Sequence, residues 1–272
     1  MTGAPPKPIR FGDLGVRLAS GLVLACVALA DVWMGGLWAL ALVILLVVLM
    51  MWELHRMVTG DGRTPAPAFL LLAAAAALGA VLSVYAGIGA GVAAMLAGAV
   101  AVLVLVRPGG AFLAGGLVYV GVPMSALLVF RSDATDGFAI ILWLVLVVVA
   151  ADIGAYFVGR TIGGAKLWAR VSPGKTRSGA LGGLAFAGLT GVVFSLAAGW
   201  NPSRTGALSV GVALASQAGD LLESAVKRRF GVKDSSQLIP GHGGVLDRLD
   251  ALIGGVWFYG VCALAGVTVN GA

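Results

Sequence analysis

The feature that most constrains this chain is a series of apolar segments, each close to the length that crosses a lipid bilayer. A transmembrane helix needs about 20 predominantly apolar residues. Nine segments approach this length, near 18–34, 36–52, 68–86, 88–106, 111–130, 137–158, 180–200, 205–226 and 249–269. The sequence therefore predicts an all-α fold: a polytopic integral membrane helical bundle with about nine transmembrane helices.

The composition excludes a soluble globule. Of the 272 residues, 60% are hydrophobic and 11% are charged, whereas soluble domains carry about 25% charged residues. Pro5, Pro6 and Pro8 precede an apolar run that is too long for a signal peptide, so we expect a retained first helix. Cys26 and Cys262 fit no metal or redox spacing and are expected to pack as small apolar residues.

The orientation follows from the basic residues, because cytoplasmic loops are enriched in Lys and Arg. With the N-terminus in the cytoplasm, the inner segments hold all but Arg131 and Arg204 of the 18 basic residues. The net charge of +6 thus mainly reflects the basic residues of the cytoplasmic segments. We expect no nucleic-acid partner, since no basic stripe interleaved with aromatic residues is present.

The chain divides into two unequal regions. Residues 1–135 form an expected scaffold of transmembrane helices, in which Asp31 is the main intramembrane acid and is expected at the interface. Residues 136–272 form an expected catalytic region with cytoplasmic loops at 159–179 and 227–248, which carry ten basic residues. The chemistry is therefore expected in the second region.

Ionisable residues inside the predicted spans are the first site candidates. Asp152, Asp220 and Glu223 lie within or at the mouth of spans, where a charge is costly unless it is paired, hydrated or bound to a metal. At 3.6 residues per turn, one face of the eighth span collects Ser216, Asp220, Glu223, Ser224 and Lys227. Such a stripe predicts a polar bundle interior or a watery cavity.

The second candidate is the segment from Pro240 to Asp250. Asp247 and Asp250 are three residues apart, so a helical start would place both on one side. The glycines around His242 would let backbone N–H groups approach an anionic ligand. Carboxylates beside Lys and Arg suit a Mg²⁺–phosphate site. Surface ion pairs at a helix start are the alternative for the Asp247–Asp250 motif alone; intramembrane Asp220 and the glycine loop favour the metal site.

These residues resemble a known family, the phosphatidate cytidylyltransferases, also called CDP-diacylglycerol synthases. The matching pattern runs Ser224-Ala225-Val226-Lys227-Arg228, then Lys233-Asp234, then Pro240-x-His242-Gly243-Gly244-x-x-Asp247-Arg248-x-Asp250. The upstream stretches Asp152-x-x-x-Tyr156-x-x-Gly159-Arg160 and Ser172-Pro173-Gly174-Lys175-Thr176 are similar to a second part of the family pattern. One departure is Arg177-Ser178, where the family commonly has an apolar residue followed by an acid or glutamine.

The resemblance implies a reaction in which CTP and phosphatidate give CDP-diacylglycerol and pyrophosphate, with Mg²⁺ and a possible second cation, K⁺. It implies that Asp220, Asp247 and Asp250 hold the metal and that phosphates are contacted by Lys227, Arg228, Lys233 and Arg248. Nucleotide contacts are expected from His242, Gly243, Gly244, Lys175, Ser172 and Asp152. It further implies a bacterial inner membrane, a site that faces the cytoplasm, and a possible homodimer.

Two other functions stay open at this point. A lipid kinase that uses CTP to phosphorylate a polyprenol or phytol would share the spans and the metal–nucleotide site. A cation-coupled transporter would use Asp152, Asp220 and Glu223 as an ion path.

Overall fold

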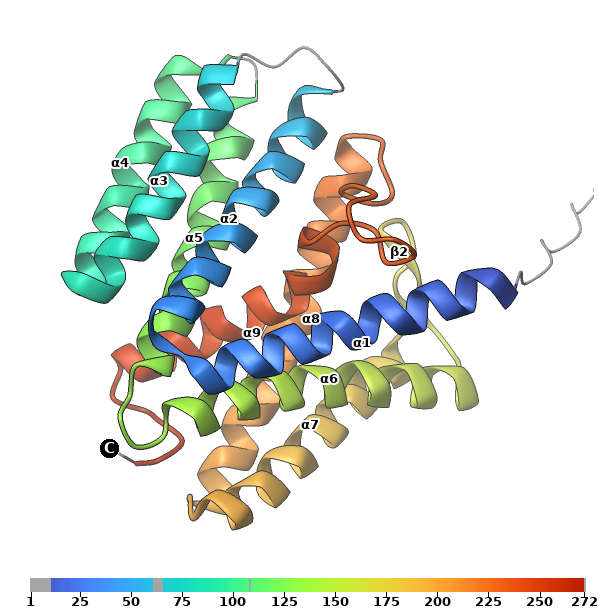
Figure 1. Ribbon diagram of the computed structural model, residues 1–272. Helices are drawn as coiled ribbons and strands as arrows, with labels where there is room; N and C mark the ends of the chain where they lie inside the picture. Colours follow the sequence, from blue (N-terminus) through green and yellow to red (C-terminus); the bar gives the residue numbers. More distant parts are fainter. Residues whose placement is uncertain (1–10, 61–65, 108, 272) are drawn as a thin grey trace, which may run out of the picture.

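The computed structural model describes residues 11–60, 66–107 and 109–271, and within these ranges it holds nine α-helices and one β-hairpin (Figure 1). Each helix coincides with one predicted apolar segment. The helices are α1 (Phe11–Met34), α2 (Gly36–Thr59), α3 (Ala66–Tyr85), α4 (Ile88–Leu105), α5 (Gly110–Arg131), α6 (Gly137–Thr161), α7 (Arg177–Ala198), α8 (Pro202–Arg229) and α9 (Leu246–Leu264).

Six of these helices, α2 to α7, are long and apolar enough to cross a membrane by length and composition. In α1, the apolar stretch Ala19–Met34 is shorter. Helices α8 and α9 carry the charged candidate residues and are not among the six. The prediction of a helical membrane protein is confirmed, and a crossing by all nine helices stays a prediction.

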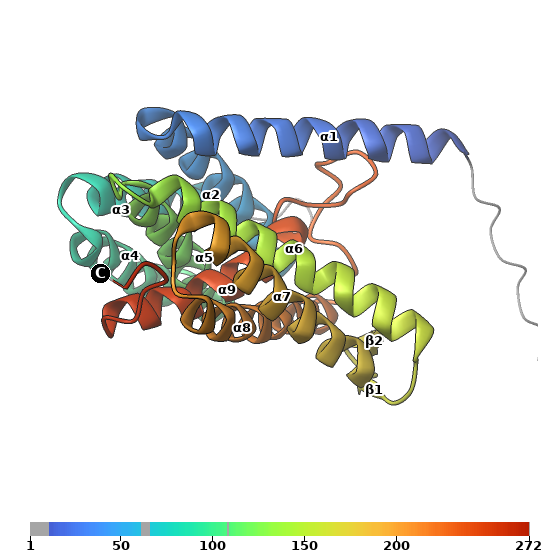
Figure 2. The same ribbon diagram turned by 90° about the horizontal axis from the view of Figure 1, so that it is seen from below.

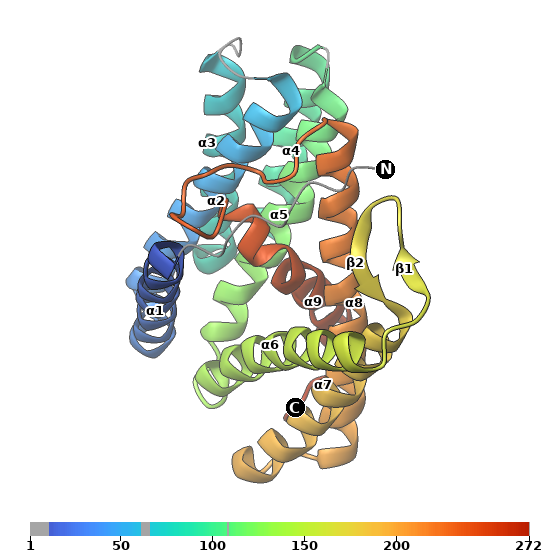
Figure 3. The ribbon, with the colours of Figure 1, turned by 90° about the vertical axis from the view of Figure 1, so that its right-hand side faces the viewer.

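Helices α2 to α5 lie side by side and form one group, which is coloured blue to green in Figure 1. Their shared core is built from fully buried side chains that include Met50, Met51, Leu72 and Leu117. Helices α6 and α7 run across the direction of this group, as Figures 1 and 3 show. The second core lies among α6 to α9, where buried Trp143 donates to Ser209 Oγ at 2.9 Å and meets Tyr259 edge to face.

Helix α1 turns away from α2 at Gly35. The chain turns between the two helices there, with φ of 62° at Gly35 and 55° at Gly36, a conformation that favours glycine. The Arg131 guanidinium occupies the inside of the turn and donates to the carbonyls of Val32 and Trp33. As a result, α1 does not pack along α2 but runs in roughly the direction of α6 (Figure 2).

The loop after α6 folds into a hairpin that the sequence did not predict. Strands β1 (Lys166–Trp168) and β2 (Ser172–Thr176) pair antiparallel, with Lys166 opposite Thr176. Thr176 then caps α7, since its side chain accepts the N–H of Gly179 at 3.1 Å. The hairpin lies beside α8 (Figure 3), which brings β2 to the candidate residues.

Candidate active site

A polar cavity of about 580 Å³ opens between α6, the β-hairpin, α7 and α8. Lys175 on β2 and Asp220 on α8 form an ion pair at its wall. The other polar side chains that line it are Asp152, Tyr156, Arg160, Thr176 and Gln217. The structure thus brings together the upstream motif and the eighth predicted span, which are about 45 residues apart along the chain.

The polar stripe on α8 faces the interior, as its periodicity predicted. Ser216, Glu223 and Lys227 are buried, at 2%, 5% and 8% exposure. The Lys227 ammonium bridges two carboxylates, with Nζ 2.6 Å from Glu223 Oε2 and 2.7 Å from Asp247 Oδ1. A buried cation between two acids keeps the cluster close to charge balance, which a membrane interior requires.

Asp247 lies in the first turn of α9 and accepts hydrogen bonds at both carboxylate oxygens. Besides Lys227, its donors are the Ser235 N–H and hydroxyl and the Gly244 N–H, at 2.9 to 3.2 Å. These contacts anchor the loop between α8 and α9. Contact with a metal ion would require Asp247 to exchange one of these donors.

A second carboxylate, Glu53 on α2, holds the same loop, and the sequence analysis passed over it. Its side chain is fully buried and accepts the N–H groups of Val245 and Leu246 at 2.8 and 2.7 Å. It also accepts the hydroxyls of Ser235 and Ser236, at 3.2 and 2.6 Å. Four donors compensate the cost of burying this charge. The only signal in the sequence was an acid directly after the apolar segment 36–52.

Asp250 lies next to Asp220 because α8 and α9 cross closely. A Cβ at Gly219 would lie 2.7 Å from the carbonyl oxygen of Asp250, and one at Gly254 would lie 2.3 Å from that of Ala215. Glycine at both positions lets the backbones approach. Asp250 is 9% exposed, and its carboxylate accepts the Ala251 N–H at 2.7 Å.

The glycine loop is occupied by contacts within the protein. The Gly243 N–H donates to the Ile239 carbonyl, and the Gly244 N–H donates to Asp247. His242 Nδ1 lies 2.9 Å from Ser20 Oγ on α1, and the His242 carbonyl accepts from Arg248 Nε at 2.9 Å. The loop therefore reaches from α9 to α1, and in this arrangement the N–H groups of Gly243 and Gly244 are paired within the protein.

The remaining predicted residues lie at the edge of the site. Arg228, in the last turn of α8, and Lys233, on the loop after it, are exposed, and Arg228 donates to the Val232 carbonyl at 3.0 Å. Ser172 opens β2 opposite Trp168 and is half-buried. Within the described ranges, none of these side chains makes a hydrogen bond to Asp220.

The acidic side chains of this region are suitable ligands for a cation, although they do not form a complete coordination shell. Hard oxygen ligands are offered by Asp152, Asp220, Glu223, Asp247 and Asp250. Lys175 pairs with Asp220, and Lys227 pairs with Glu223 and Asp247. No three His, Cys, Asp or Glu side chains converge as a metal site in residues 11–60, 66–107 and 109–271. A Mg²⁺ ion that takes one or two carboxylates and fills its other positions with phosphates needs no such cage.

The fold and the site define the class: this is a helical integral membrane protein with a partly buried cluster of acidic and basic side chains. The sequence pattern of the cytidylyltransferase family matches residues 15–264. The chain therefore belongs to the cytidylyltransferase family.

Individual relatives match the chain over about half its length. A protein named phosphatidate cytidylyltransferase from Brucella melitensis is 50% identical over 142 residues, which are 52% of each chain. Proteins of the same name from Haemophilus influenzae and Bacillus subtilis are 46% and 37% identical, over 136 and 144 residues. The matches cover 48% and 52% of this chain and 47% and 54% of the relatives. This chain thus spans about half the length of the curated relatives it matches.

Proposed function

We propose that the protein is a phosphatidate cytidylyltransferase, which transfers a cytidylyl group from CTP to phosphatidate and releases pyrophosphate. The observation that carries the proposal is the cavity that joins Lys175 and Asp220, beside the cluster of Glu223, Lys227 and Asp247. Family membership and the names of the three relatives support the same activity.

In the proposed reaction, a phosphate oxygen of phosphatidate attacks the α-phosphorus of CTP. The new P–O bond forms as the bond between the α-phosphorus and the β-phosphate oxygen breaks, and pyrophosphate leaves with its negative charge. Positioning and charge neutralisation dominate such reactions. Lys175 lines the cavity and would contact phosphate there, and Arg228, Lys233 and Arg248 would supply further positive charge.

Mg²⁺ is the proposed cofactor, and when bound it neutralises phosphate oxygens and orients them. Asp220 and Asp250 are the proposed carboxylate ligands, because neither makes as many contacts with protein donors as Asp247 does. Asp247 is the third candidate ligand and also anchors the loop and orients Lys227. Asp152, Ser172, His242, Gly243 and Gly244 stay proposed nucleotide contacts, and K⁺ a proposed second cation.

The setting is a proposal as well. All nine helices would cross the inner membrane of a bacterium, with the N-terminus and the polar cluster on the cytoplasmic side, where CTP is available. The clustering of basic residues in the inner segments supports this orientation. A homodimer is the proposed assembly.

The test is pyrophosphate release by detergent-purified protein given CTP, phosphatidate and Mg²⁺, with product analysis. Release that requires both substrates and yields a CDP-lipid is the expected result. Formation of CDP and a phosphorylated polyprenol or phytol would establish the lipid kinase instead. Substrate flux into liposomes without pyrophosphate release would establish a transporter.

A further inference from the structure

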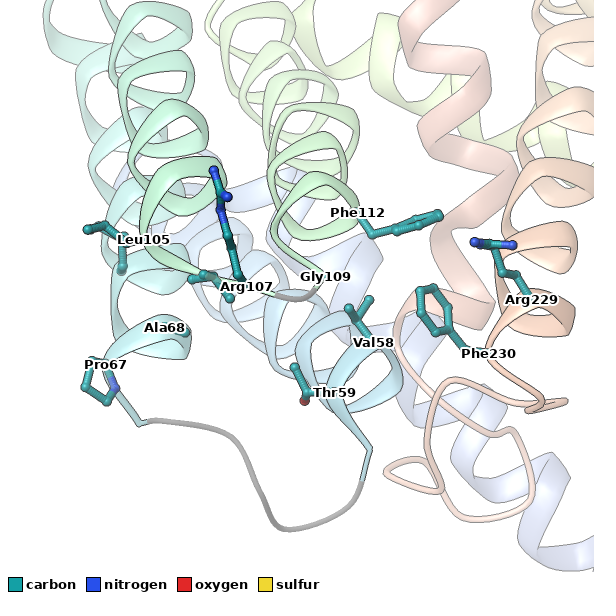
Figure 4. Close-up of a pocket in the computed structure, with 12 residues that line it drawn as sticks. Val58, Thr59, Pro67, Ala68, Leu105, Arg107, Gly109, Phe112, Arg229 and Phe230 are labelled. Carbon is teal, nitrogen blue, oxygen red and sulfur yellow. The ribbon is translucent and has the colours of Figure 1, made fainter.

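A second cavity, of about 780 Å³, lies outside the polar site, among the ends of α2, α3, α4, α5 and α8 (Figure 4). Its walls are mainly apolar side chains, among them Val58, Leu71, Phe112 and Phe230. Two arginines, Arg107 and Arg229, also line it. Among the described residues that line it, none is acidic. We call this cavity the lipid groove, for the reasons that follow.

Arg229 is held at the groove by aromatic rings. Its guanidinium carbon lies 5.4 Å from the centre of the Phe112 ring, and Phe112 meets Phe230 edge to face with ring centres 5.0 Å apart. Figure 4 shows the rings of Phe112 and Phe230 next to the Arg229 side chain. Stacking on a ring fixes a guanidinium while leaving its N–H groups able to bind an anion. The arrangement therefore presents a positioned cation at the edge of an apolar surface.

A smaller cavity, of about 290 Å³, lies between α2, α5 and α8 and reaches the buried acid cluster. Phe112 lines both cavities. The smaller cavity is bounded by apolar residues of α2, α5 and α8, such as Leu54 and Val226, and it reaches Glu223. Arg229 is two residues after Lys227, the residue that bridges Glu223 and Asp247. The groove and the acid cluster thus lie on two sides of the same end of α8.

From this geometry we infer that the groove binds the lipid substrate of the proposed reaction, phosphatidate, before its phosphate reaches the acid cluster. The inference deepens the proposed function and rests on it. Acyl chains would pack on Val58, Leu71 and Phe112, the phosphomonoester would bind Arg229, and Arg107 would add positive charge to the same cavity. Apolar walls favour a chain over a water-soluble anion, and two arginines without an acid match a headgroup of more than one negative charge.

The experiment uses a phosphatidate that carries a photoactivatable diazirine in one acyl chain, in vesicles that contain the full-length protein. After irradiation, mass spectrometry locates the label. We expect labelled peptides from the second half of α2, from α3 and from the start of α5. Unlabelled phosphatidate should compete with the labelling, and diacylglycerol, which lacks the phosphate, should not.

Kinetics supply the second readout. Arg229→Gln is expected to raise the KM for phosphatidate on the order of tenfold, as the loss of a charge-assisted contact would, and to leave the KM for CTP unchanged. Leu71→Trp, which fills the groove, should raise the same constant and reduce labelling. The matched control is Arg204→Gln, at the opposite end of α8, which should change neither.

The possible results distinguish a failure of the lipid groove from a failure of the proposed reaction. An active wild-type protein whose label maps elsewhere, or whose Arg229→Gln variant keeps the wild-type KM for phosphatidate, would overturn the groove. Equal competition by diacylglycerol would overturn the role of the arginines and with it the inference. Specific labelling in a protein that forms no CDP-lipid would overturn the proposed reaction while leaving a phosphatidate-binding groove.

Discussion

The carboxylate of Glu53 accepts the backbone N–H of Leu246 at 2.7 Å, and this contact joins the first helical group to the start of α9. The first N–H groups of a helix have no partner within the helix. A buried anion there satisfies them and interacts favourably with the helix dipole. Because Asp247 and Asp250 follow directly in α9, Glu53 fixes the position of both acids without belonging to the polar cavity.

The Glu53 contact predicts that Glu53→Gln destabilises the protein. The amide keeps one acceptor oxygen, but its NH₂ group would face donors that need an acceptor, at a cost of about 3 kcal/mol. The midpoint of thermal unfolding in detergent should fall, and activity should fall with it. Ser83→Ala is the control, since it removes a buried hydroxyl that donates only within α3. An unchanged midpoint for Glu53→Gln would contradict the anchoring role.

The tight loop predicts that Gly244 tolerates no side chain. A Cβ there would lie 1.9 Å from Ser235 Oγ and 2.6 Å from Glu53 Oε1, so Gly244→Ala must displace the contacts that anchor the loop. We expect a loss of roughly 2 kcal/mol or more in stability, and a loss of activity. Gly89→Ala in α4, where a Cβ meets nothing within 4 Å, is the matched control. Equal thermal midpoints for the two variants would show that the loop adapts.

The environment of Asp247 predicts a large loss of activity for Asp247→Asn. The variant removes the charge that pairs with Lys227 and places an NH₂ group among donors. Pyrophosphate release should fall on the order of 10³-fold. Asp133→Asn, in the turn after α5, is the control, because Asp133 also accepts two backbone N–H groups. Near-normal turnover by a folded Asp247→Asn protein would refute the assignment.

The pair of Lys175 and Asp220 predicts a selective effect of Lys175→Gln. Loss of the ammonium removes a phosphate contact and leaves Asp220 without this partner, so turnover should fall by about 10²-fold. The KM for CTP should rise as well. Lys166→Gln in β1 is the control, because Lys166 lies on the same hairpin and is exposed. An equal response of the two variants would mean that the hairpin contributes only general positive charge.

The carboxylates of the candidate site predict a strict requirement for a divalent cation. A chelator should abolish pyrophosphate release, and added Mg²⁺ should restore it. The carboxylates of Asp220 and Asp250 and the triphosphate are all negatively charged, so a cation must lie between them. A chelator saturated with Mg²⁺ beforehand is the control and should have no effect. Turnover that persists in the chelator alone would remove the metal from the proposal.

The sequence determined the features that depend on neighbouring residues. The apolar segments located every described helix, since hydropathy and length are local properties, although α1 begins seven residues before its predicted segment and α2 ends seven residues after its own. The 3.6-residue period placed Glu223 and Lys227 on one buried face of α8, where they form an i,i+4 ion pair. The helical start at Leu246 put Asp247 and Asp250 in consecutive turns, as their spacing indicated.

Only the tertiary structure decided which distant residues meet. Lys175 reaches Asp220 because the loop after α6 folds into a hairpin beside α8, and Glu53 reaches Leu246 across 193 positions of the chain. The lipid groove likewise joins side chains from five helices. The physical reason is that such contacts depend on where helices cross and how closely their glycines let them approach, and no local period in the sequence encodes either.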